Sequence, residues 1–413
     1  MNLSFLDVVF FAYTFISLYM LNFFLVLYFT NKNKMFHYPP GKPEPVSIVM
    51  PCFNEGHHIG EAIEALLAMD YPKNMIEIII VDDKSTDNSA DVVRGYVKKY
   101  SNVRLIINSR NSGGAAEPTN LGVKAAKYDY VAVADADSIP DRDALRKMIG
   151  FIQRDKKVGV VTCSILVKKP WNFLQKIQAY EYFIIAFTRK LLDMVDSIYV
   201  TPGPLALYRK DVLFEVGLFD TKNITQDIEM TWNIMAHGYY AKMCMDAKVY
   251  AASPTKFKGW WKQRVRWNVG GIQTLFKYKK FWFREMLGMF VMPLFALGMG
   301  LGVFGIGLFA YLMFKNVILS YLSVKYSFYA STTLLSMSDL TFTPSILNFF
   351  GAAMFILAFW FTLFGLWIME AKELLGKKDI ISLMFYLIVY MLLYPFTFLT
   401  AVVKVMKGNY SWR

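Results

Sequence analysis

Two groups of acidic residues follow short apolar runs, at the points where buried strands would end. They are Asp82-Asp83 and Asp135-Ala136-Asp137. In an extended chain alternate side chains project to the same side, so Asp135 and Asp137 can act on one target. Mg²⁺ and Mn²⁺ accept carboxylate oxygens together with the phosphate oxygens of a substrate. The second group therefore predicts a divalent cation, Mg²⁺ or Mn²⁺, held against a phosphorylated substrate.

A third apolar run, Val46 to Met50, leads into the polar segment Pro51 to Glu55. One acid after a strand is usually a helix cap. Polar segments after three parallel strands meet at one sheet edge, however, and ligands bind beyond that edge. The sequence contains neither GxxxxGK[ST] nor a strand-linked GxGxxG, so kinase and dehydrogenase functions lack their usual phosphate loop. Ser112 to Gly114 is either a simple turn or a helix start that favours a phosphate.

A basic and aromatic segment, Gly259 to Trp267, precedes the second long apolar stretch. As a helix it places Gln263, Arg266 and Trp267 on one face, because positions three and four apart are neighbours. That face cannot lie wholly in lipid, since an unpaired Arg266 is costly there, so we expect it to face the sheet edge. The opposite face is typical of an interfacial membrane anchor. Its aromatic residues are Phe257, Trp260 and Trp261.

The elements that must position these side chains alternate between short β-branched runs and helix-length segments. This alternation predicts an α/β domain with a mainly parallel, Rossmann-like sheet covered on both faces. The expected strands are Val46 to Met50, Ile76 to Val81, Val103 to Ile107, Tyr130 to Ala134 and Gly159 to Ser164. The expected helices are His57 to Met69, Asn88 to Tyr100 and Pro118 to Ala126, with Thr225-Gln226-Asp227 starting another.

Four stretches are long and apolar enough to cross about 30 Å of hydrocarbon. They are Phe5 to Phe29, Met286 to Phe314, Ile346 to Met369 and Ile380 to Val403. Residues 253–284 carry nine basic and no acidic residues, so the positive-inside rule predicts a cytoplasmic central domain. Basic residues also flank the last stretch on both sides. We expect a cytoplasmic tail, which requires either a further crossing within residues 317–338 or a re-entrant last stretch.

These patterns divide the chain into four expected parts. Residues 1–30 form an N-terminal membrane helix, 31–252 a cytoplasmic catalytic domain, 253–284 a basic interfacial helix region, and 285–413 a C-terminal membrane region. Hydrophobic residues make up 55% of the chain and charged residues only 19%, which excludes a disordered or collagen-like protein. The net charge of +13 suits a phosphorylated substrate and an anionic membrane face, with no need for nucleic acid. Three widely spaced cysteines argue against a disulfide framework or structural zinc site.

In this order and spacing the motifs resemble the membrane-integrated family 2 glycosyltransferases, which include hyaluronan, cellulose and poly-N-acetylglucosamine synthases and ceramide glucosyltransferase. The resemblance covers roughly residues 44 to 280. Its pieces are Pro51-Cys52-Phe53-Asn54-Glu55, Asp82-Asp83, Asp135-Ala136-Asp137, Gly203-Pro204, Thr225-Gln226-Asp227 and Gln263-Arg264-Val265-Arg266-Trp267. It implies a GT-A fold embedded between membrane helices and a nucleotide-sugar donor, expected to be a UDP-sugar.

The resemblance also implies residue roles. Pro51, Phe53 and Glu55 would line the nucleoside pocket, Asp83 would contact the base, and Asp82 would support that loop. Asp135 and Asp137 would hold Mg²⁺ or Mn²⁺ against the donor diphosphate, and Asp227 would be the general base. Gln263, Arg266 and Trp267 would close over the diphosphate and the acceptor sugar, with Arg264 adding electrostatic stabilisation. Two departures stand out. Gln226 replaces the usual acid before Asp227, and Ala115-Ala116 stands where many members have a lysine, so that phosphate contact is either missing or supplied elsewhere, by Arg110 or Lys124.

We therefore expect an inverting glycosyltransferase that extends a polysaccharide at the cytoplasmic membrane face, in contact with membrane lipids. A non-processive enzyme acting on a lipid-linked acceptor would share every donor-site residue, and it stays open as the alternative. A channel with a nucleotide domain is disfavoured, because ion paths usually contain intramembrane charges and the last three apolar stretches have none.

Overall fold

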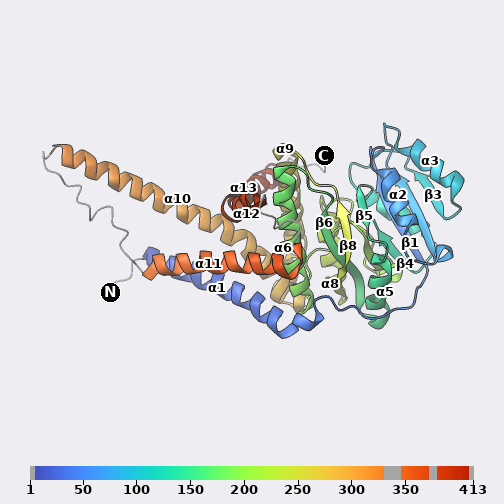
Figure 1. Cartoon of the computed structure of the whole chain (residues 1–413), viewed down its shortest axis with the longest axis horizontal. Coiled ribbons are helices and arrows are strands. Elements are labelled where there is room, and N and C mark those ends of the chain that lie inside the picture. Colours follow the sequence, from blue (N-terminus) through green and yellow to red (C-terminus); the bar gives the residue numbers. More distant parts are fainter. Residues whose placement is uncertain (1–4, 330–345, 372–378, 409–413) are drawn as a thin grey trace.

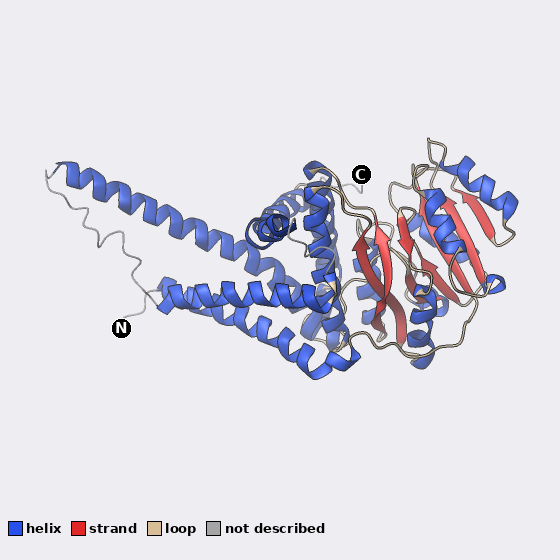
Figure 2. Ribbon diagram, viewed as in Figure 1, coloured by secondary structure: helices blue, strands red, loops and turns tan. Residues whose placement is uncertain are grey.

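The computed structural model describes residues 5–329, 346–371 and 379–408. One eight-stranded sheet forms the core of its α/β domain, which lies at the opposite end from the long apolar helices (Figures 1 and 2). The strands are β1 (Val46–Cys52), β2 (Ile76–Asp82), β3 (Val103–Ile107), β4 (Tyr130–Val133), β5 (Ser138–Pro140), β6 (Val158–Val167), β7 (Ala206–Arg209) and β8 (Tyr240–Ala251). Their order across the sheet is β3-β2-β1-β4-β7-β6-β8-β5. Only β7 and β5 run antiparallel to their neighbours, so the expected mainly parallel sheet is confirmed.

The domain helices are α2 (Ile59–Leu67), α3 (Ser89–Lys99), α4 (Ala116–Ala125), α5 (Ala144–Arg154), α6 (Phe173–Asp193), α7 (Lys210–Glu215), α8 (Gln226–Ala236) and α9 (Phe257–Lys277). All five expected strands and the first three expected helices are present, with ends shifted by a few residues. The strand β8 was not expected, because charged residues interrupt its apolar pattern. Its burial alternates, with Lys242, Asp246 and Lys248 on the less buried positions, as the period of a strand requires.

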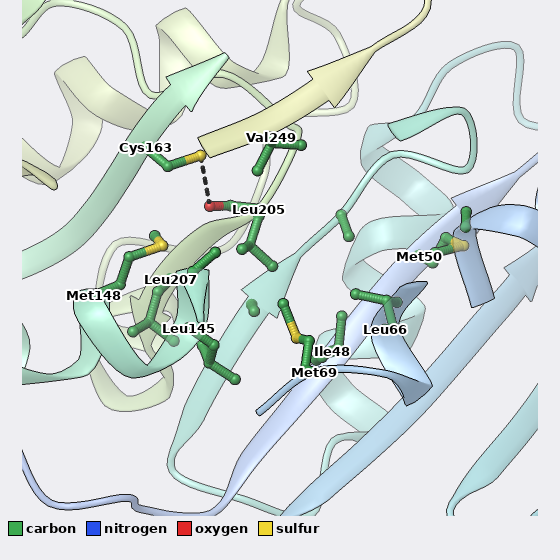
Figure 3. Packing of buried hydrophobic residues seen from close by; sticks show 14 of the residues in the cluster. Ile48, Met50, Leu66, Met69, Leu145, Met148, Cys163, Leu205, Leu207 and Val249 are labelled. Atoms are coloured by element: carbon green, nitrogen blue, oxygen red, sulfur yellow. Dashed lines mark hydrogen bonds between the residues drawn. The ribbon is translucent and has the colours of Figure 1, made fainter. Parts of the chain in front are cut away.

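Two hydrophobic clusters hold the sheet, one on each face. Alternate residues of β1 divide between them: Ile48 and Met50 belong to one cluster and Val49 to the other. In Figure 3, Ile48 and Met50 pack with Leu66 and Met69 at the α2 end of the core. Strands buried on both faces need helices on both faces, which explains their near-continuous apolar sequences. All three cysteines are free and buried, so the expectation that they form no disulfide framework is confirmed.

Three apolar helices leave the domain in the same general direction (Figure 1). They are α1 (Phe5–Asn31), α10 (Met292–Tyr329) and α11 (Ile346–Ile368). Within the described residues, two helices are long and apolar enough to cross a membrane, Val8–Lys34 and Leu287–Tyr326. Residues 317–329 continue α10, so the separate crossing considered for 317–338 is wrong over that part. Residues 330–338 lie outside the described residues.

The last apolar stretch is a bent pair of helices, α12 (Ile380–Phe385) and α13 (Met391–Met406), joined by a π-helical turn. The two halves meet at 45°. Figure 1 shows this pair nearly end-on, whereas α1 and α11 run across the view. The pair packs along the domain helices, since Lys176 of α6 forms an ion pair with Asp379 (2.6 Å) and Asn268 of α9 donates to Thr397 (3.1 Å). The geometry thus differs from the straight span that the apolar composition suggested.

Candidate active site

Hydrogen bonds join the loops that follow β1 and β2 at the carboxyl edge of the sheet. Asn54 adopts a left-handed conformation (φ 56°); its N–H donates to Ser85 Oγ (2.9 Å), and its Oδ1 accepts the Thr86 N–H (2.8 Å). Two loops tied in this way form a fixed rim beyond the parallel strands. The residues expected to line a nucleoside pocket belong to this rim: Pro51, Phe53 and Glu55.

The two acids after β2 are both buried but have different partners. The Asp83 carboxylate accepts hydrogen bonds from the Asn108 amide (2.9 Å) and from the N–H and Oγ of Ser112 (3.0 and 2.8 Å). Asp82 accepts only the Ser85 N–H through Oδ2 (3.2 Å), and its Oδ1 has no partner among the described residues. Asp83 therefore supports the loop, the task that the resemblance gave to Asp82. Which of the two contacts a base stays a prediction.

Four carboxylates gather where β4 ends: Glu55, Asp135, Asp137 and Asp227. Burial, with the negative charges of Asp137 and Asp227, raises the pKa of Asp135 to about 8. Burial also raises the pKa of Asp137. Burial and the charge of Asp137 raise the pKa of Glu55 to about 7. Like charges that perturb one another this strongly are close together, so this edge is suited to a cation.

A hydrogen-bonded turn sets the spacing between Asp135 and Asp227. Gly203 lies so close to Asp135 that a Cβ there would be 2.7 Å from Oδ1. The N–H of Thr201, in the same turn, donates to Thr231 Oγ1 of α8 (2.9 Å), and Thr231 donates to the backbone oxygen of Asp227 (2.6 Å). The turn thus joins the strand-end acid to the helix that carries Asp227.

Asp227 lies in the first turn of α8 between two arginines. Burial raises its pKa, while the positive charges of Arg266 and Arg189 oppose the rise. Arg189 of α6 is 7% exposed, and its Nε has no hydrogen-bond partner among the described residues. A carboxylate flanked by cations can remain ionised in a buried site, as a proton acceptor must. Arg189 was not predicted as a site residue, because it belongs to no motif and α6 was not among the expected helices.

A glycine allows α9 to approach the start of α8 closely. A Cβ at Gly270 would lie 2.6 Å from both Cβ and Cγ2 of Thr225, and closer still to its Oγ1. The neighbouring Gly271 makes a similar approach to Phe295 of α10 (2.5 Å). Two consecutive glycines therefore let α9 fit between the catalytic domain and an apolar helix. This fit places the Arg266 face of α9 beside Asp227 and Asp135, whose charges both act on Arg266.

Arg264 does not face the donor edge, and its expected electrostatic role there is wrong. It is fully buried and forms an ion pair with Glu181 of α6. Its Nε also contacts Tyr394 Oη (3.1 Å), and Tyr390 donates to the same Glu181 carboxylate. A buried arginine requires such partners because an unpaired charge is costly away from water. Arg264 therefore joins α9 to α6 and α13.

The same arginine orients two of the predicted catalytic side chains. Its Nη1 donates to the Gln263 amide oxygen, which leaves the amide NH₂ as a donor. Its guanidinium lies 4.2 Å from the ring centroid of Trp267, within cation–π range. Trp260, expected on a membrane-anchor face, is instead completely buried and donates to Tyr390. Among the three motif residues, Arg266 is the one on which the charges of Asp227 and Asp135 act, and the catalytic roles of Gln263, Arg266 and Trp267 stay predictions.

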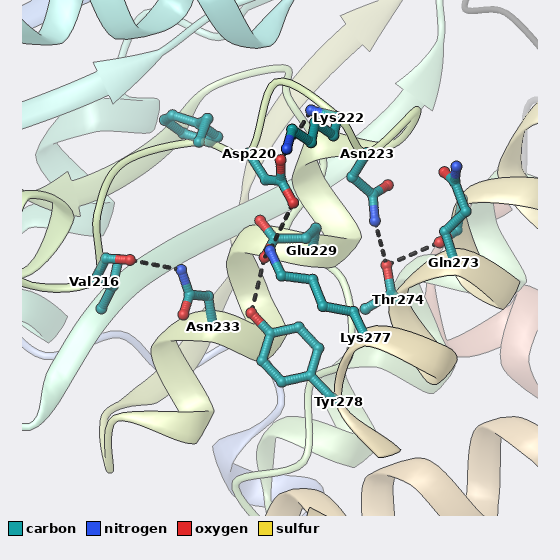
Figure 4. Close-up of polar contacts among 12 residues, drawn as sticks. Val216, Asp220, Lys222, Asn223, Glu229, Asn233, Gln273, Thr274, Lys277 and Tyr278 are labelled. Carbon is teal, nitrogen blue, oxygen red and sulfur yellow. Dashed lines mark hydrogen bonds and ion pairs between the residues drawn. The ribbon is translucent and has the colours of Figure 1, made fainter. Parts of the chain in front are cut away.

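A second polar cluster fixes the far end of α9 to α8 (Figure 4). The buried Glu229 accepts hydrogen bonds from Lys277 (2.5 Å) and Tyr278 (2.8 Å), and Lys277 also pairs with Asp220 (2.6 Å). Glu229 lies two residues after Asp227 on α8. The cluster therefore restrains α8 on the side away from the sheet edge.

A cleft of about 160 Å³ lies between the Ser112–Glu117 turn and residues 221–226. The start of α4 and the start of α8 both border it, and helix starts favour anions. Lys222 is its cation. Arg110, considered as a phosphate ligand, instead lies 3.6 Å from Glu117 in an ion pair. Lys222 belongs to no motif, so the sequence analysis did not predict it as a residue of this cleft.

Comparison with known proteins identifies the family to which the chain belongs. The family model Glycosyl transferase family 2 matches residues 47–217. Poly-beta-1,6-N-acetyl-D-glucosamine synthase of Staphylococcus aureus (strain COL) is 32% identical over 281 residues, 67% of each chain. The enzyme of the same name from Staphylococcus epidermidis is 34% identical over 242 residues, covering 58% of this chain and 57% of that one.

A solved structure with the same fold covers nearly the whole chain. The mannosyltransferase PcManGT from Pyrobaculum calidifontis, solved with GDP-Man and Mn²⁺, covers 98% of this chain and 100% of its own, with TM-score 0.65 and 18% identity. This likeness shows the fold alone, a GT-A domain joined to apolar helices. Together with the staphylococcal relatives and the matched family model, it leads to one conclusion: the chain belongs to glycosyltransferase family 2.

Proposed function

We propose that this protein is an inverting, metal-dependent hexosyltransferase that adds sugars from a UDP-sugar to a growing polysaccharide. The observation that carries the proposal is the meeting of Asp135, Asp137, Asp227 and Arg266 at the carboxyl edge of the sheet. The staphylococcal relatives are named as synthases of an N-acetylglucosamine polymer, which supports a polysaccharide product.

The carboxylates present fit a divalent cation that the donor helps to hold. No described set of three or more His, Cys, Asp or Glu side chains could by itself hold a metal ion. Mg²⁺ is usually bound through one or two carboxylates plus substrate phosphates, and Asp135 and Asp137 provide that pair. A bound cation would supply charge neutralisation to the departing diphosphate.

The protein's own residues would perform the remaining chemistry. Asp227 removes the proton from the acceptor hydroxyl, and that oxygen attacks the anomeric carbon opposite the departing nucleoside diphosphate. The new bond therefore has inverted configuration. Arg266 stabilises the negative charge that develops on the diphosphate, and the Gln263 amide and Trp267 position the acceptor. Arg264 holds both of these side chains without touching substrate.

Replacing Asp227 by Asn tests the base. Asn keeps size and hydrogen bonding but cannot accept the proton, and a positioned base typically contributes about 10²–10⁴-fold. We expect turnover to fall by that factor while donor affinity, measured by calorimetry, is retained. Asp91→Asn is a matched control, because Asp91 also lies in a helix first turn but is exposed on α3. Equal losses of donor binding and turnover would make Asp227 a donor ligand and overturn the assignment.

Donor and product are tested with purified full-length protein and a panel of UDP- and GDP-sugars, with Mn²⁺ or Mg²⁺. The nucleotide released names the donor, and loss of activity in EDTA is the expected result of metal removal. Product sizing then separates polymer from glycolipid. The small number of apolar helices in the described residues favours the glycolipid alternative, since a polymer channel needs many helices. Full activity in EDTA would contradict the metal assignment.

The protein is a membrane protein, and we propose that it is multi-pass with the catalytic domain in the cytoplasm. The basic residues near the domain ends of α1 and α10 support this orientation. A cysteine introduced at Lys34 or Lys280, in a background without native thiols, should be protected from impermeant reagents in intact cells. Labelling at either position would reverse the orientation.

A further inference from the structure

The outer face of the α12–α13 pair is a continuous apolar stripe that no described residue covers. Its members recur every three or four residues, which keeps them on one side of the helices. They are between 40% and 59% exposed: Ile380, Met384, Ile388, Leu392, Phe396, Leu399 and Val403. Such a face on a protein of this class belongs in hydrocarbon.

Both ends of the pair nevertheless lie against the catalytic domain. At its start Asp379 pairs with Lys176 of α6 (2.6 Å). Near its end Ala401 is fully buried in a cluster with Val265 and Val269 of α9. A span would carry one end about 30 Å across the hydrocarbon, away from the domain. The pair therefore lies at the membrane surface on the domain side, with the stripe toward lipid.

A groove of about 620 Å³ lies between this pair and α9. Trp261 of α9 forms one wall, and Phe396, Leu399 and Val403 of α13 form the other. The volume is within the range of about 300–1,000 Å³ that suits small ligands. From Phe396 to Lys407 the groove follows eleven residues of helix, about 16 Å. That length is about half the 30 Å hydrocarbon core, and so about one acyl chain.

Two cations lie at one end of this apolar groove. Lys404 and Lys407 both line it, are exposed, and are three residues apart on α13. Within residues 5–329, 346–371 and 379–408, neither lysine forms an ion pair with a carboxylate. An apolar channel that ends at two unpaired ammonium groups matches a ligand with a hydrocarbon chain and an anionic head.

We propose that this groove binds one anionic phospholipid, with an acyl chain beside Trp261 and the phosphate between Lys404 and Lys407. A zwitterionic lipid would fill the apolar part but gain little from two lysines. A partner helix would cover the stripe and leave both ammonium groups without a counter-charge. The proposal goes beyond the proposed function and can be tested without turnover.

The test uses full-length protein in lipid nanodiscs and brominated lipids, because bromine quenches tryptophan fluorescence only on contact. We expect brominated phosphatidylglycerol to quench more than brominated phosphatidylcholine, and the difference to disappear in Trp261→Phe. Lys404→Ala/Lys407→Ala should weaken phosphatidylglycerol binding about 30-fold, from about 1 kcal/mol for each lysine near an anionic surface. Lys98→Ala/Lys99→Ala is the matched control, since these lysines lie at the end of α3, and it should bind as wild type.

Several results would overturn the proposal. Equal quenching by the two lipids would mean that the groove contacts lipid without selecting charge. Quenching that survives Trp261→Phe would place the lipid elsewhere. Competition by inorganic phosphate as strong as that by phosphatidylglycerol would reduce the site to an anion site. Should the double lysine variant fail to fold, the wild-type and Trp261→Phe comparison still decides the question.

Discussion

The substitution Gly270→Ala on α9 tests whether the close packing of α9 against α8 sets the spacing of Arg266 and Asp227. The added Cβ would lie 2.6 Å from Cβ and Cγ2 of Thr225, whereas carbon atoms rest about 3.5–4.0 Å apart. Thr225 is 6% exposed at the start of α8, so it has little room to move. The two helices must therefore separate by about 1 Å. Because Arg266 and Asp227 lie on these two helices, their spacing changes by a similar amount.

The expected effects follow from that displacement. Ala would favour the helix by about 1 kcal/mol relative to Gly, but overpacking costs about 1–3 kcal/mol, so the net change in unfolding free energy is small or destabilising. Turnover should suffer more, since a displacement of about 1 Å can cost about 10²-fold. Donor affinity should change little, because the loops after β1 and β2 are not involved.

The assay compares kcat, donor binding and thermal unfolding across three variants. Gly259→Ala is the matched control, because it lies on the same helix and its Cβ would meet only Pro254 at an ordinary 3.5 Å. The double variant Gly270→Ala/Thr225→Gly removes the clashing side chain and should recover most of the lost turnover, because substitutions of residues in contact are not additive. Wild-type kcat in Gly270→Ala alone would refute the reasoning.

Three further predictions concern the charges and rings of the site. In the folded, metal-free protein the pKa of Asp135 is raised from 3.8 to about 8, so the stability that this group contributes is lost as the pH rises from about 4 to 8. Binding of Mn²⁺ near pH 7 should then release about one proton. Calorimetry in buffers of different ionisation enthalpy measures this release, and finding no released proton would contradict the reasoning. Arg264→Met leaves the buried Glu181 carboxylate without a counter-charge, although Tyr390 still donates to it, and should cost about 3–5 kcal/mol of unfolding free energy. Most of this loss should be recovered when Glu181 is also changed to Leu, and an unchanged melting temperature for the single variant would contradict the buried pair. Trp267→Ala should retain the fold and donor binding but lose transfer to the acceptor, whereas Trp260→Ala should lose about 3–5 kcal/mol of unfolding free energy. Activity and melting assays test this, and the reverse pattern would make Trp260 the acceptor contact and Trp267 the packing residue.

Local patterns were sufficient to predict the parallel half of the sheet. The runs of β1 and β2 are apolar except for Ser47 and Glu77, because both of their faces are covered, and they stand out from their surroundings. The acids that follow these strands were predicted at one edge, since parallel strands end together. Strand β8 was missed because it carries Lys242, Asp246 and Lys248, and a half-buried strand near an edge tolerates such alternation.

The α9 helix shows the limit of reasoning from helical spacing. Spacing placed Gln263, Arg266 and Trp267 on one face, and in the structure the charges of Asp227 and Asp135 act on Arg266. Spacing could not assign Arg264, whose partners Glu181 and Tyr390 are distant in sequence. An arginine next to a basic motif suggests phosphate binding, and only its burial against two other helices revealed a different task.

The sequence by itself determined the class of this protein: an α/β domain with strand-end acids, a basic aromatic helix and apolar segments on both sides. These features are local in the chain, because strand and helix periods and acid positions are set by neighbouring residues. The tertiary structure alone decided which charges meet. It brought the charges of Arg266 and Arg189 to act on Asp227, paired Arg264 with Glu181, and packed α12–α13 against α6 and α9. Those outcomes depend on contacts between residues far apart in sequence, such as Gly270 against Thr225, and no local pattern encodes such a contact.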